Sequence, residues 1–278
     1  VEITGEEIRE KDWQGREDRR DYPVVTVDSE DARDLDDAVY VRRLDNGRYL
    51  LGVYIADVSY YVKAKTLLDQ EAQERGTSVY LVDRVLPMLP QRLSNGICSL
   101  NEKEDRLVMS CEMEIEAETG RITKYRIFPA VIHSHHRLSY NLVRAILEEG
   151  DKKAREDYAD IIPMLEEMRE LCRVLQKKRA RRGAIEFDLP EQKVILDEAG
   201  KPLEIKQRIH GLPESIIDTF MLAANETVAR HLSMLQWPCV YRVHESPAED
   251  KMEGLAKLLQ SFNVKLRIPK NGEVRPKD

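Results

Sequence analysis

The chain has 278 residues, of which 42% are hydrophobic and 34% charged. This length allows one large α/β domain or two smaller ones. No run of about 18 apolar residues is present that would span a bilayer, and the charged first residues lack the apolar core of a secretory signal. We therefore expect a cytoplasmic protein that is not a membrane protein. The net charge of −7 excludes a strongly basic surface, so a polyanion would have to bind at a local site.

The first half of the chain predicts strands around one short helix. Residues 1–21 are polar and are expected to link a preceding domain to an ordered domain spanning 22–278. The apolar runs predict strands at 23–27, 38–44 and 48–56, a helix at 66–76, extended chain at 78–83, and two long strands within 105–133. A tight turn is predicted at Asp45-Asn46-Gly47. Prolines and Asn95-Gly96 predict irregular chain at 85–101.

The second half predicts mainly helices. Helical periodicity covers 139–150, 163–183, about 213–236 and 249–262, and a strand pair is expected within 193–208. Runs of strands followed by runs of helices are typical of an α+β fold, here with a mixed, largely antiparallel sheet and surrounding helices.

The stretch between the first two predicted strands is strongly acidic. Six acids fall within ten residues, and only Arg33 compensates them locally; they are Asp28, Glu30, Asp31, Asp34, Asp36 and Asp37. Like charges this close repel by about 1 kcal/mol or more per pair in a partly desolvated setting. A bound cation would offset that repulsion.

The spacing of four aspartates favours a metal site. In extended chain, Asp34 and Asp36 project to the same side, Asp37 lies beside them, and Asp28 at the end of the preceding strand can close on the group. Carboxylates are the ligands that Mg²⁺ and Mn²⁺ prefer. Two such ions about 4 Å apart can activate a water molecule and stabilise the leaving oxygen of a phosphodiester. A solvated acidic turn and a purely structural metal site are alternatives that spacing alone does not separate.

Other candidate sites are weaker. His133, His135 and His136 lie at a strand end without a cysteine or carboxylate at ligand spacing, so we interpret them as surface histidines. The cysteines, far apart and without a CxxC pair, are interpreted as structural; they are Cys98, Cys111, Cys172 and Cys239. The basic run 177–182 is interpreted as the solvated end of a helix, with phosphate contact as the alternative.

Several motifs together resemble a known family. TVDSEDARDLDDAV, IADVSYYV, VLPMLPQRLSNGICSLN and FMLAANETVA occur in one collinear order from about residue 20 onward. In these motifs the sequence resembles the catalytic RNB domain of the ribonuclease II and ribonuclease R family, and looks closest to its bacterial ribonuclease R branch. The resemblance implies a processive 3'-to-5' exoribonuclease that hydrolyses single-stranded RNA to nucleoside 5'-monophosphates with a divalent metal, usually Mg²⁺.

The resemblance also implies roles for individual residues. The family's four catalytic and metal-binding aspartates fall on Asp28, Asp34, Asp36 and Asp37, with Asp36 most directly tied to cleavage. Four further positions match residues that contact RNA. Tyr80 and Phe187 match aromatics that stack on bases, Tyr140 matches a tyrosine near the terminal nucleotides, and Asp218 stands where the family usually has Glu near the ribose 2'-hydroxyl.

The sequence departs from the family pattern in two respects. Asp218 is one methylene shorter than the usual Glu, which puts sugar discrimination in question. The family's SPIRR-like arginine segment and its flanking oligonucleotide-binding barrels do not occur in these 278 residues. We therefore expect part of a longer enzyme, monomeric and weakly active or inactive alone. One alternative is an RNB-like RNA-binding module that has lost its chemistry. A DNA-directed or nucleotide-directed metal phosphohydrolase is a third option, which cleavage of 2'-deoxy oligomers would distinguish.

Overall fold

The computed structural model of the chain describes residues 8–185, 191–197, 200–208, 210–243 and 245–266. Its main sheet has six strands in the order β1-β8-β2-β3-β4-β7, and β8 also pairs with β7. The strands are β1 (Glu17–Asp18), β2 (Val24–Asp28), β3 (Asp37–Arg43), β4 (Tyr49–Ala56), β7 (Asp105–Ile115) and β8 (Ile122–Ser139). Parallel pairing joins β8 to β1 and β2, and the other pairs are antiparallel. The predicted α+β fold with a mixed, largely antiparallel sheet is confirmed.

The long strand β8 closes the sheet on itself. Its first part pairs with β7 from Ile122 to His133, and its last part pairs with β2 from Ser134 to Ser139. Because β2, β3, β4 and β7 are neighbours in turn, the hydrogen-bonded strands form a closed circuit. The predicted turn between β3 and β4 is present, and Gly47 supplies its positive φ of 76°. This circuit holds the ends of β2 and β3 in fixed positions.

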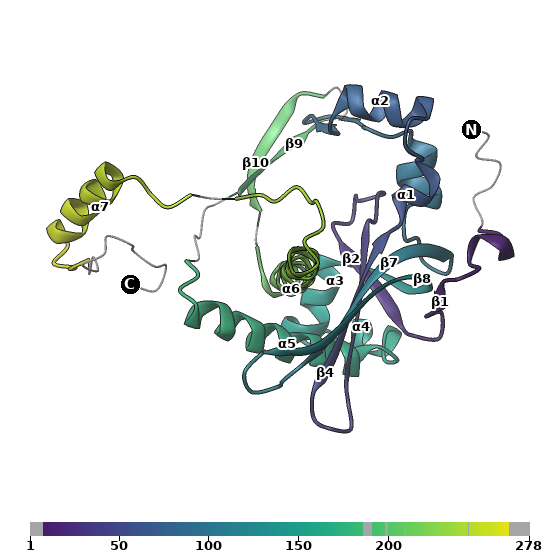
Figure 1. Cartoon of the computed structure of the whole chain (residues 1–278), viewed down its shortest axis with the longest axis horizontal. Helices are drawn as coiled ribbons and strands as arrows, with labels where there is room; N and C mark the ends of the chain where they lie inside the picture. Colours follow the sequence, from purple (N-terminus) through teal and green to yellow (C-terminus); the bar gives the residue numbers. More distant parts are fainter. Residues whose placement is uncertain (1–7, 186–190, 198–199, 209, 244, 267–278) are drawn as a thin grey trace.

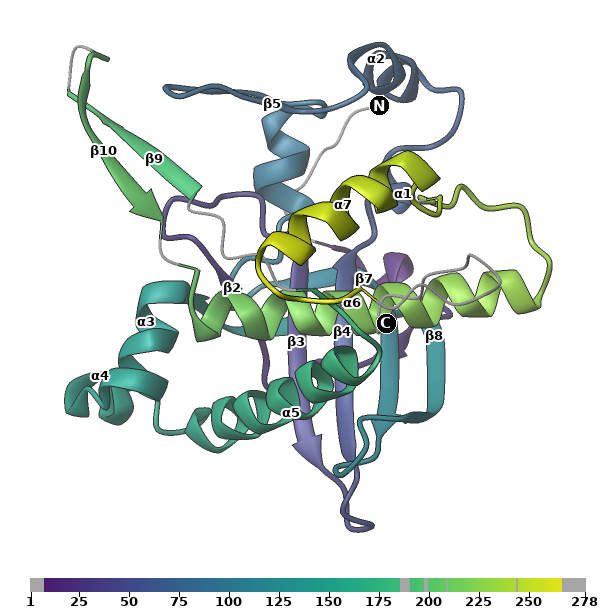
Figure 2. The same ribbon diagram turned by 90° about the vertical axis from the view of Figure 1, so that its left-hand side faces the viewer.

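Two long helices cover one face of the sheet. In Figure 2, α5 (Ile162–Arg181) and α6 (Leu212–Met234) cross in front of the strands. The buried residues of α5 recur at helical spacing and so form one face. They are Met164, Leu165, Met168, Leu171, Cys172 and Leu175. Each such apolar side chain contributes about 1.5–3 kcal/mol on burial. Both helices match their predicted ranges within two residues.

The remaining elements are shorter or lie at the margins. They are α1 (Val58–Tyr61), α2 (Leu67–Arg75), β5 (Val79–Tyr80), β6 (Val85–Leu86), α3 (Tyr140–Arg144), α4 (Lys152–Asp157), β9 (Glu191–Leu196), β10 (Pro202–Arg208) and α7 (Glu249–Ser261), with 3₁₀ turn η1 (Glu10–Asp12) and π-helical turns η2 (Arg92–Ile97) and η3 (Ala145–Glu149). Figure 1 shows α7 well apart from the sheet and the β9–β10 hairpin projecting from the body. Segment 85–101, predicted to be irregular, contains β6 and η2. Among the described residues, no helix has the length and apolar character needed to cross a membrane.

Part of the polar segment 1–21 contacts the sheet. Glu17 and Asp18 pair with Ala130 and Val131 of β8. Arg16 forms an ion pair with Asp57 at 2.5 Å, and Arg19 forms one with Glu112 at 2.6 Å. These guanidinium groups are largely buried, so residues 16–19 are attached to the sheet.

The free cysteines differ in exposure. Cys98, Cys111 and Cys172 are buried, in agreement with a structural role, whereas Cys239 is exposed. Burial raises the pKa of the Cys111 thiol to about 11, which keeps it protonated and unreactive at neutral pH.

Candidate active site in the acidic loop

The acidic loop connects the ends of two neighbouring strands. Asp28 is the last residue of β2 and Asp37 is the first residue of β3. Since β2 and β3 pair antiparallel through Val25 and Val39, the two aspartates leave the sheet at the same edge. Apolar runs on either side fix this arrangement, because Val24, Val25 and Val39 are fully buried in the core.

Ser99 fixes the loop from one side. Its buried hydroxyl accepts a hydrogen bond from the Leu35 backbone N–H at 3.1 Å and lies 2.9 Å from the Arg33 carbonyl oxygen, to which it can donate. The Leu100 N–H donates to the Leu35 carbonyl at 2.9 Å. With Leu35 anchored in the core, its neighbours Asp34 and Asp36 must both point away from it, as the alternation of an extended chain requires.

Strand β8 and helix α3 fix the loop from the other side. The Arg137 guanidinium donates to the carbonyl oxygens of Glu30 and Ala32, at 3.2 Å and 2.6 Å. The Asn141 amide donates to the Glu30 carboxylate at 2.9 Å. Glu30 is therefore held by a side chain of α3.

Burial and neighbouring carboxylates raise the pKa of two of these aspartates. Burial, followed by the charges of Asp28, Asp36 and Asp218, raises the pKa of Asp37 to about 6. Partial burial and the charges of Asp34 and Asp28 likewise raise the pKa of Asp36. The structure thus brings all four predicted aspartates and Asp218 into one electrostatic cluster. Uncompensated negative charge of this kind is the environment that a divalent cation stabilises.

The four carboxylates fit divalent metal as a group. They are hard oxygen donors, and the chain supplies no nitrogen or sulfur ligand among them, which suits Mg²⁺ or Mn²⁺. Among the described residues, their oxygens do not form a cluster of three within 4.8 Å.

Helices α3 and α6 add a tyrosine and a fifth carboxylate. Tyr140 is the first residue of α3, and burial together with Asp28, Asp37, Asp218 and Glu214 raises its pKa to about 12. Its hydroxyl therefore stays protonated at neutral pH and can donate a hydrogen bond. Asp218 is exposed on α6 and lies 3.6 Å from Nε2 of His210.

The predicted RNA-stacking aromatics have different outcomes. Tyr80, in the β5–β6 hairpin, is 68% exposed, and its hydroxyl donates to Asp34 at 3.2 Å. An aromatic ring with this exposure is available for stacking. Phe187 lies outside the described residues, so its predicted role stays a prediction.

The end of the basic run contacts protein. The Arg182 guanidinium forms a bidentate ion pair with the Glu226 carboxylate of α6, with N···O distances of 3.0 Å and 2.7 Å. This contact favours the interpretation of the run as the end of a helix that also ties α5 to α6.

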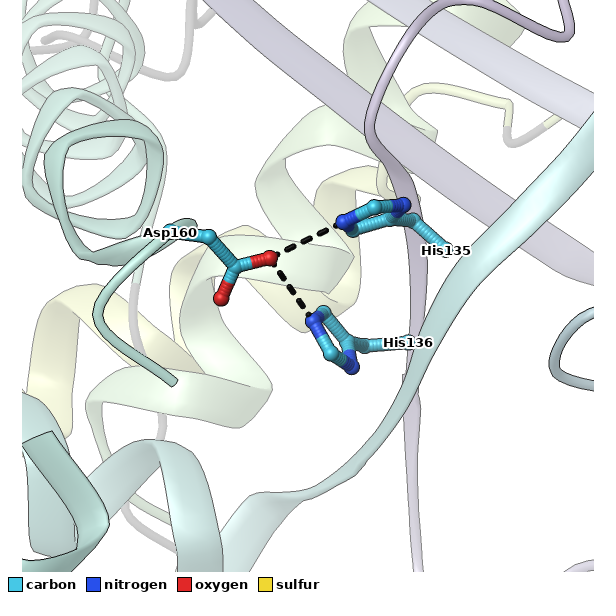
Figure 3. A group of neighbouring side chains, drawn as sticks. All are labelled: His135, His136 and Asp160. Atoms are coloured by element: carbon cyan, nitrogen blue, oxygen red, sulfur yellow. Dashed lines mark hydrogen bonds and ion pairs between the residues drawn. The ribbon is translucent and has the colours of Figure 1, made fainter. Parts of the chain in front are cut away.

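The histidines have carboxylate partners that the sequence analysis did not find. His133 contacts Asp105 at 2.7 Å, while His135 and His136 both contact Asp160, at 2.9 Å and 3.0 Å (Figure 3). The sequence offers no carboxylate at ligand spacing because Asp160 is 24 residues away from His136 in the chain but adjacent in space. Sequence spacing detects only local ligand sets.

Comparisons with known proteins place these observations in a wider context. The model of the RNB domain family matches residues 16–275. The chain is 47% identical to Ribonuclease R 1 of Lactococcus lactis over 98% of its own length, and 48% identical to Ribonuclease R of Thermotoga maritima over 94%. It spans only 33% and 36% of those two proteins, about a third of the length of the curated relatives it matches.

Solved structures of ribonuclease R are also similar to this chain. The chain is similar to Mycoplasma genitalium RNase R in complex with ribose methylated single-stranded RNA, with a TM-score of 0.86 and 33% identity. The match covers 94% of this chain and 40% of that one.

Proposed function

Because this chain belongs to the RNB domain family, we propose that it is the catalytic part of a 3'-to-5' exoribonuclease that hydrolyses single-stranded RNA to nucleoside 5'-monophosphates. The observation that carries the proposal is the acidic loop, where mutual repulsion and burial raise the pKa of both Asp36 and Asp37. Carboxylates whose pKa is raised by burial and by like charges are found preferentially at functional sites. Similar proteins also support the proposal: two are named Ribonuclease R, and one is an RNase R solved in complex with ribose methylated single-stranded RNA.

The acidic loop supplies the chemistry. Asp28, Asp34, Asp36 and Asp37 would hold Mg²⁺, or Mn²⁺ in its place. When bound, the metal supplies Lewis-acid polarisation of the phosphate and a more acidic water. Ser99 and Arg137 hold the loop backbone, so the carboxylates are oriented before RNA arrives.

The surrounding side chains would position RNA. Tyr80 offers an exposed ring against which a base can stack, a contact worth about 1–3 kcal/mol that tolerates every sequence. Tyr140 remains protonated and can donate to a phosphate or sugar oxygen beside the aspartates. Asp218, whose charge acts on Tyr140, is proposed to accept from a ribose 2'-hydroxyl, and Phe187 is proposed as the second stacking residue.

The test is a Mg²⁺-dependent time course on 5'-labelled single-stranded RNA with the chain in excess, so that a single slow turnover is visible. Asp36→Asn should abolish shortening from the 3' end while RNA binding remains. Asp45→Asn is the matched control, because Asp45 lies in the exposed turn at the opposite end of β3. RNA binding without any cleavage, by this chain and by a longer one that includes the arginine segment, would instead support the RNA-binding module.

A further inference from the structure

A second candidate metal site lies away from the acidic loop. His135 and His136 of β8 converge on the Asp160 carboxylate, which lies in the turn between α4 and α5 (Figure 3). Both imidazole Nε2 atoms contact the same oxygen, Oδ2, at 2.9 Å and 3.0 Å. One ligand atom from each of the three residues lies within 4.8 Å of the others.

A β-bulge makes this convergence possible. Consecutive side chains of a regular strand point to opposite faces of the sheet. The pairing of β8 with β2 shifts register at this point: Val24 lies opposite Ser134, whereas the next residue, Val25, lies opposite His136. His135 is therefore the extra residue, and the bulge turns its side chain toward that of His136. Bulges are found where a side chain must be redirected, often beside functional sites.

A carboxylate behind His136 orients its ring. Nδ1 of His136 lies 3.2 Å from Glu102 Oε1, and the Tyr158 ring packs edge-on against the imidazole at 5.1 Å. When zinc replaces the Nε2 hydrogen bond to Asp160, this carboxylate would keep the imidazole proton on Nδ1 and leave the Nε2 lone pair for the metal. This is the arrangement in which metal-binding histidines of proteins are held.

The local charge also favours a cation. Glu102 and Asp160 are acids, and the Lys103 ammonium, which donates to the His135 carbonyl at 2.5 Å, offsets one of them. His136 is 15% exposed and His135 39%, which leaves one side open to water.

We propose that His135, His136 and Asp160 bind one Zn²⁺ ion through their Nε2, Nε2 and Oδ2 atoms, with water as the fourth ligand. Two imidazoles and a carboxylate are a ligand set that zinc accepts in tetrahedral geometry. Ligand atoms around tetrahedral zinc lie about 3.3 Å apart, so the Nε2–Oδ2 distances need to lengthen by only a few tenths of an ångström. The ion would replace the shared hydrogen bonds and tie β8 to the α4–α5 turn.

This site differs from the acidic loop in ligand chemistry and position. It contains nitrogen ligands, which favour zinc over magnesium. His136 pairs with Val25, three residues before Asp28, so the ligands belong to a different part of the β2–β8 pair. A zinc ion held here need not take part in RNA cleavage, and its test does not depend on nuclease activity.

The test is a Zn²⁺ titration of the full chain in excess Mg²⁺, which occupies the oxygen-rich loop. Binding is followed by calorimetry and by long-range ¹H–¹⁵N NMR of the imidazoles. We expect the Nε2 resonances of His135 and His136 to shift at one equivalent of zinc, while those of His133 do not. His135→Asn should lower the zinc affinity at this site at least 100-fold.

Two further variants separate binding from folding. Glu102→Gln keeps all three ligands and should weaken zinc binding about 10-fold to 100-fold by removing the support of His136. His133→Asn is the matched control, since His133 contacts Asp105 instead, and it should bind zinc as the unmodified chain does. If the Nε2 resonances of His135 and His136 do not respond to zinc in the unmodified chain, the cluster is a hydrogen-bonded tether and the proposal is wrong.

Discussion

The Tyr80 hydroxyl donates a hydrogen bond to the Asp34 carboxylate at 3.2 Å, which joins the β5–β6 hairpin to the acidic loop. Burial and the charges of Asp34, Asp36 and Asp28 raise the pKa of Tyr80, so the hydroxyl remains a donor at neutral pH. The ring itself is exposed. One side chain thus offers a stacking surface to RNA and a polar contact to the proposed metal site.

Substitution of Tyr80 separates these two roles. Tyr80→Ala should weaken binding of single-stranded RNA by about 1–3 kcal/mol, the value of one base stacked on an aromatic ring. Tyr80→Phe keeps the ring and should bind RNA nearly as well as the unmodified chain. Fluorescence anisotropy with a labelled RNA at fixed salt concentration measures both. Equal affinity of the Ala variant and the unmodified chain would rule out stacking at this position.

The raised pKa of Asp37 predicts that the free energy of unfolding falls as the pH rises. Its pKa is raised from 3.8 to about 6, so the folded chain binds the proton more tightly than the unfolded chain does. The loss of folding free energy caused by ionised Asp37 is absent well below pH about 4. It grows as the pH rises from about 4 to about 6, and it is complete above pH about 6. Asp37→Asn should therefore raise the free energy of unfolding at pH 7.5 by on the order of 2 kcal/mol in EDTA.

Urea denaturation at several pH values measures this effect. The gain from Asp37→Asn should disappear near about pH 3, where Asp37 is mostly protonated in both states, and should shrink at pH 7.5 when Mg²⁺ replaces EDTA. Asp45→Asn is the control, because Asp45 is exposed in a turn far from the cluster. A gain that is the same at every pH would show that charge is not its cause.

Periodic and local signals were enough to predict most of the fold. Leu171, Cys172 and Leu175 share a helical face that the sequence pattern already indicates, and Gly47 supplies the positive φ that the predicted turn requires. The acidic loop was also correctly placed, because strands with apolar cores bracket it at Asp28 and Asp37. These features depend on residues that are neighbours along the chain.

Long-range contacts were not predictable in the same way. Ser99 reaches Leu35 across 64 residues, and the β8 bulge redirects His135 toward Asp160. Sequence periodicity predicts neither contact. A β-bulge interrupts the two-residue period of a strand, and a single serine has many possible hydrogen-bond partners. The attachment of Arg16 and Arg19 to the sheet was missed for a similar reason, since charged residues next to a terminus resemble a linker until their partners are known.

Ser99 is expected to stabilise the acidic loop measurably. Ser99→Ala leaves the Leu35 N–H buried without its acceptor, which should lower the free energy of unfolding by about 1–3 kcal/mol. Ser94→Ala is the matched control, because the Ser94 hydroxyl donates to the side chain of the adjacent Asn95 and not to the acidic loop. Chemical denaturation compares the two. A Ser99→Ala chain as stable as the Ser94→Ala chain would show that the hydroxyl does not hold the loop.

The ion pair between Arg144 and Glu214 joins the two helices that carry Tyr140 and Asp218. Both Glu214 oxygens accept from the Arg144 guanidinium at 3.1 Å, and one of them also accepts from the Gly211 N–H at the start of α6. Glu214 is only 9% exposed, so Arg144→Met would leave a desolvated carboxylate without its counter-ion. We expect a loss of about 2–3 kcal/mol in the free energy of unfolding.

A double-mutant cycle with Glu214→Gln isolates the contact, since glutamine retains an acceptor for Gly211. Because the two single changes remove the same interaction, the double variant should lose at least about 1 kcal/mol less than the sum of the single losses. Arg182→Met is the comparison, because the Arg182–Glu226 pair also links two helices but both side chains are about half exposed. That change should cost less than about 1 kcal/mol. Equal costs at the two pairs would mean that burial does not determine the strength of the α3–α6 contact.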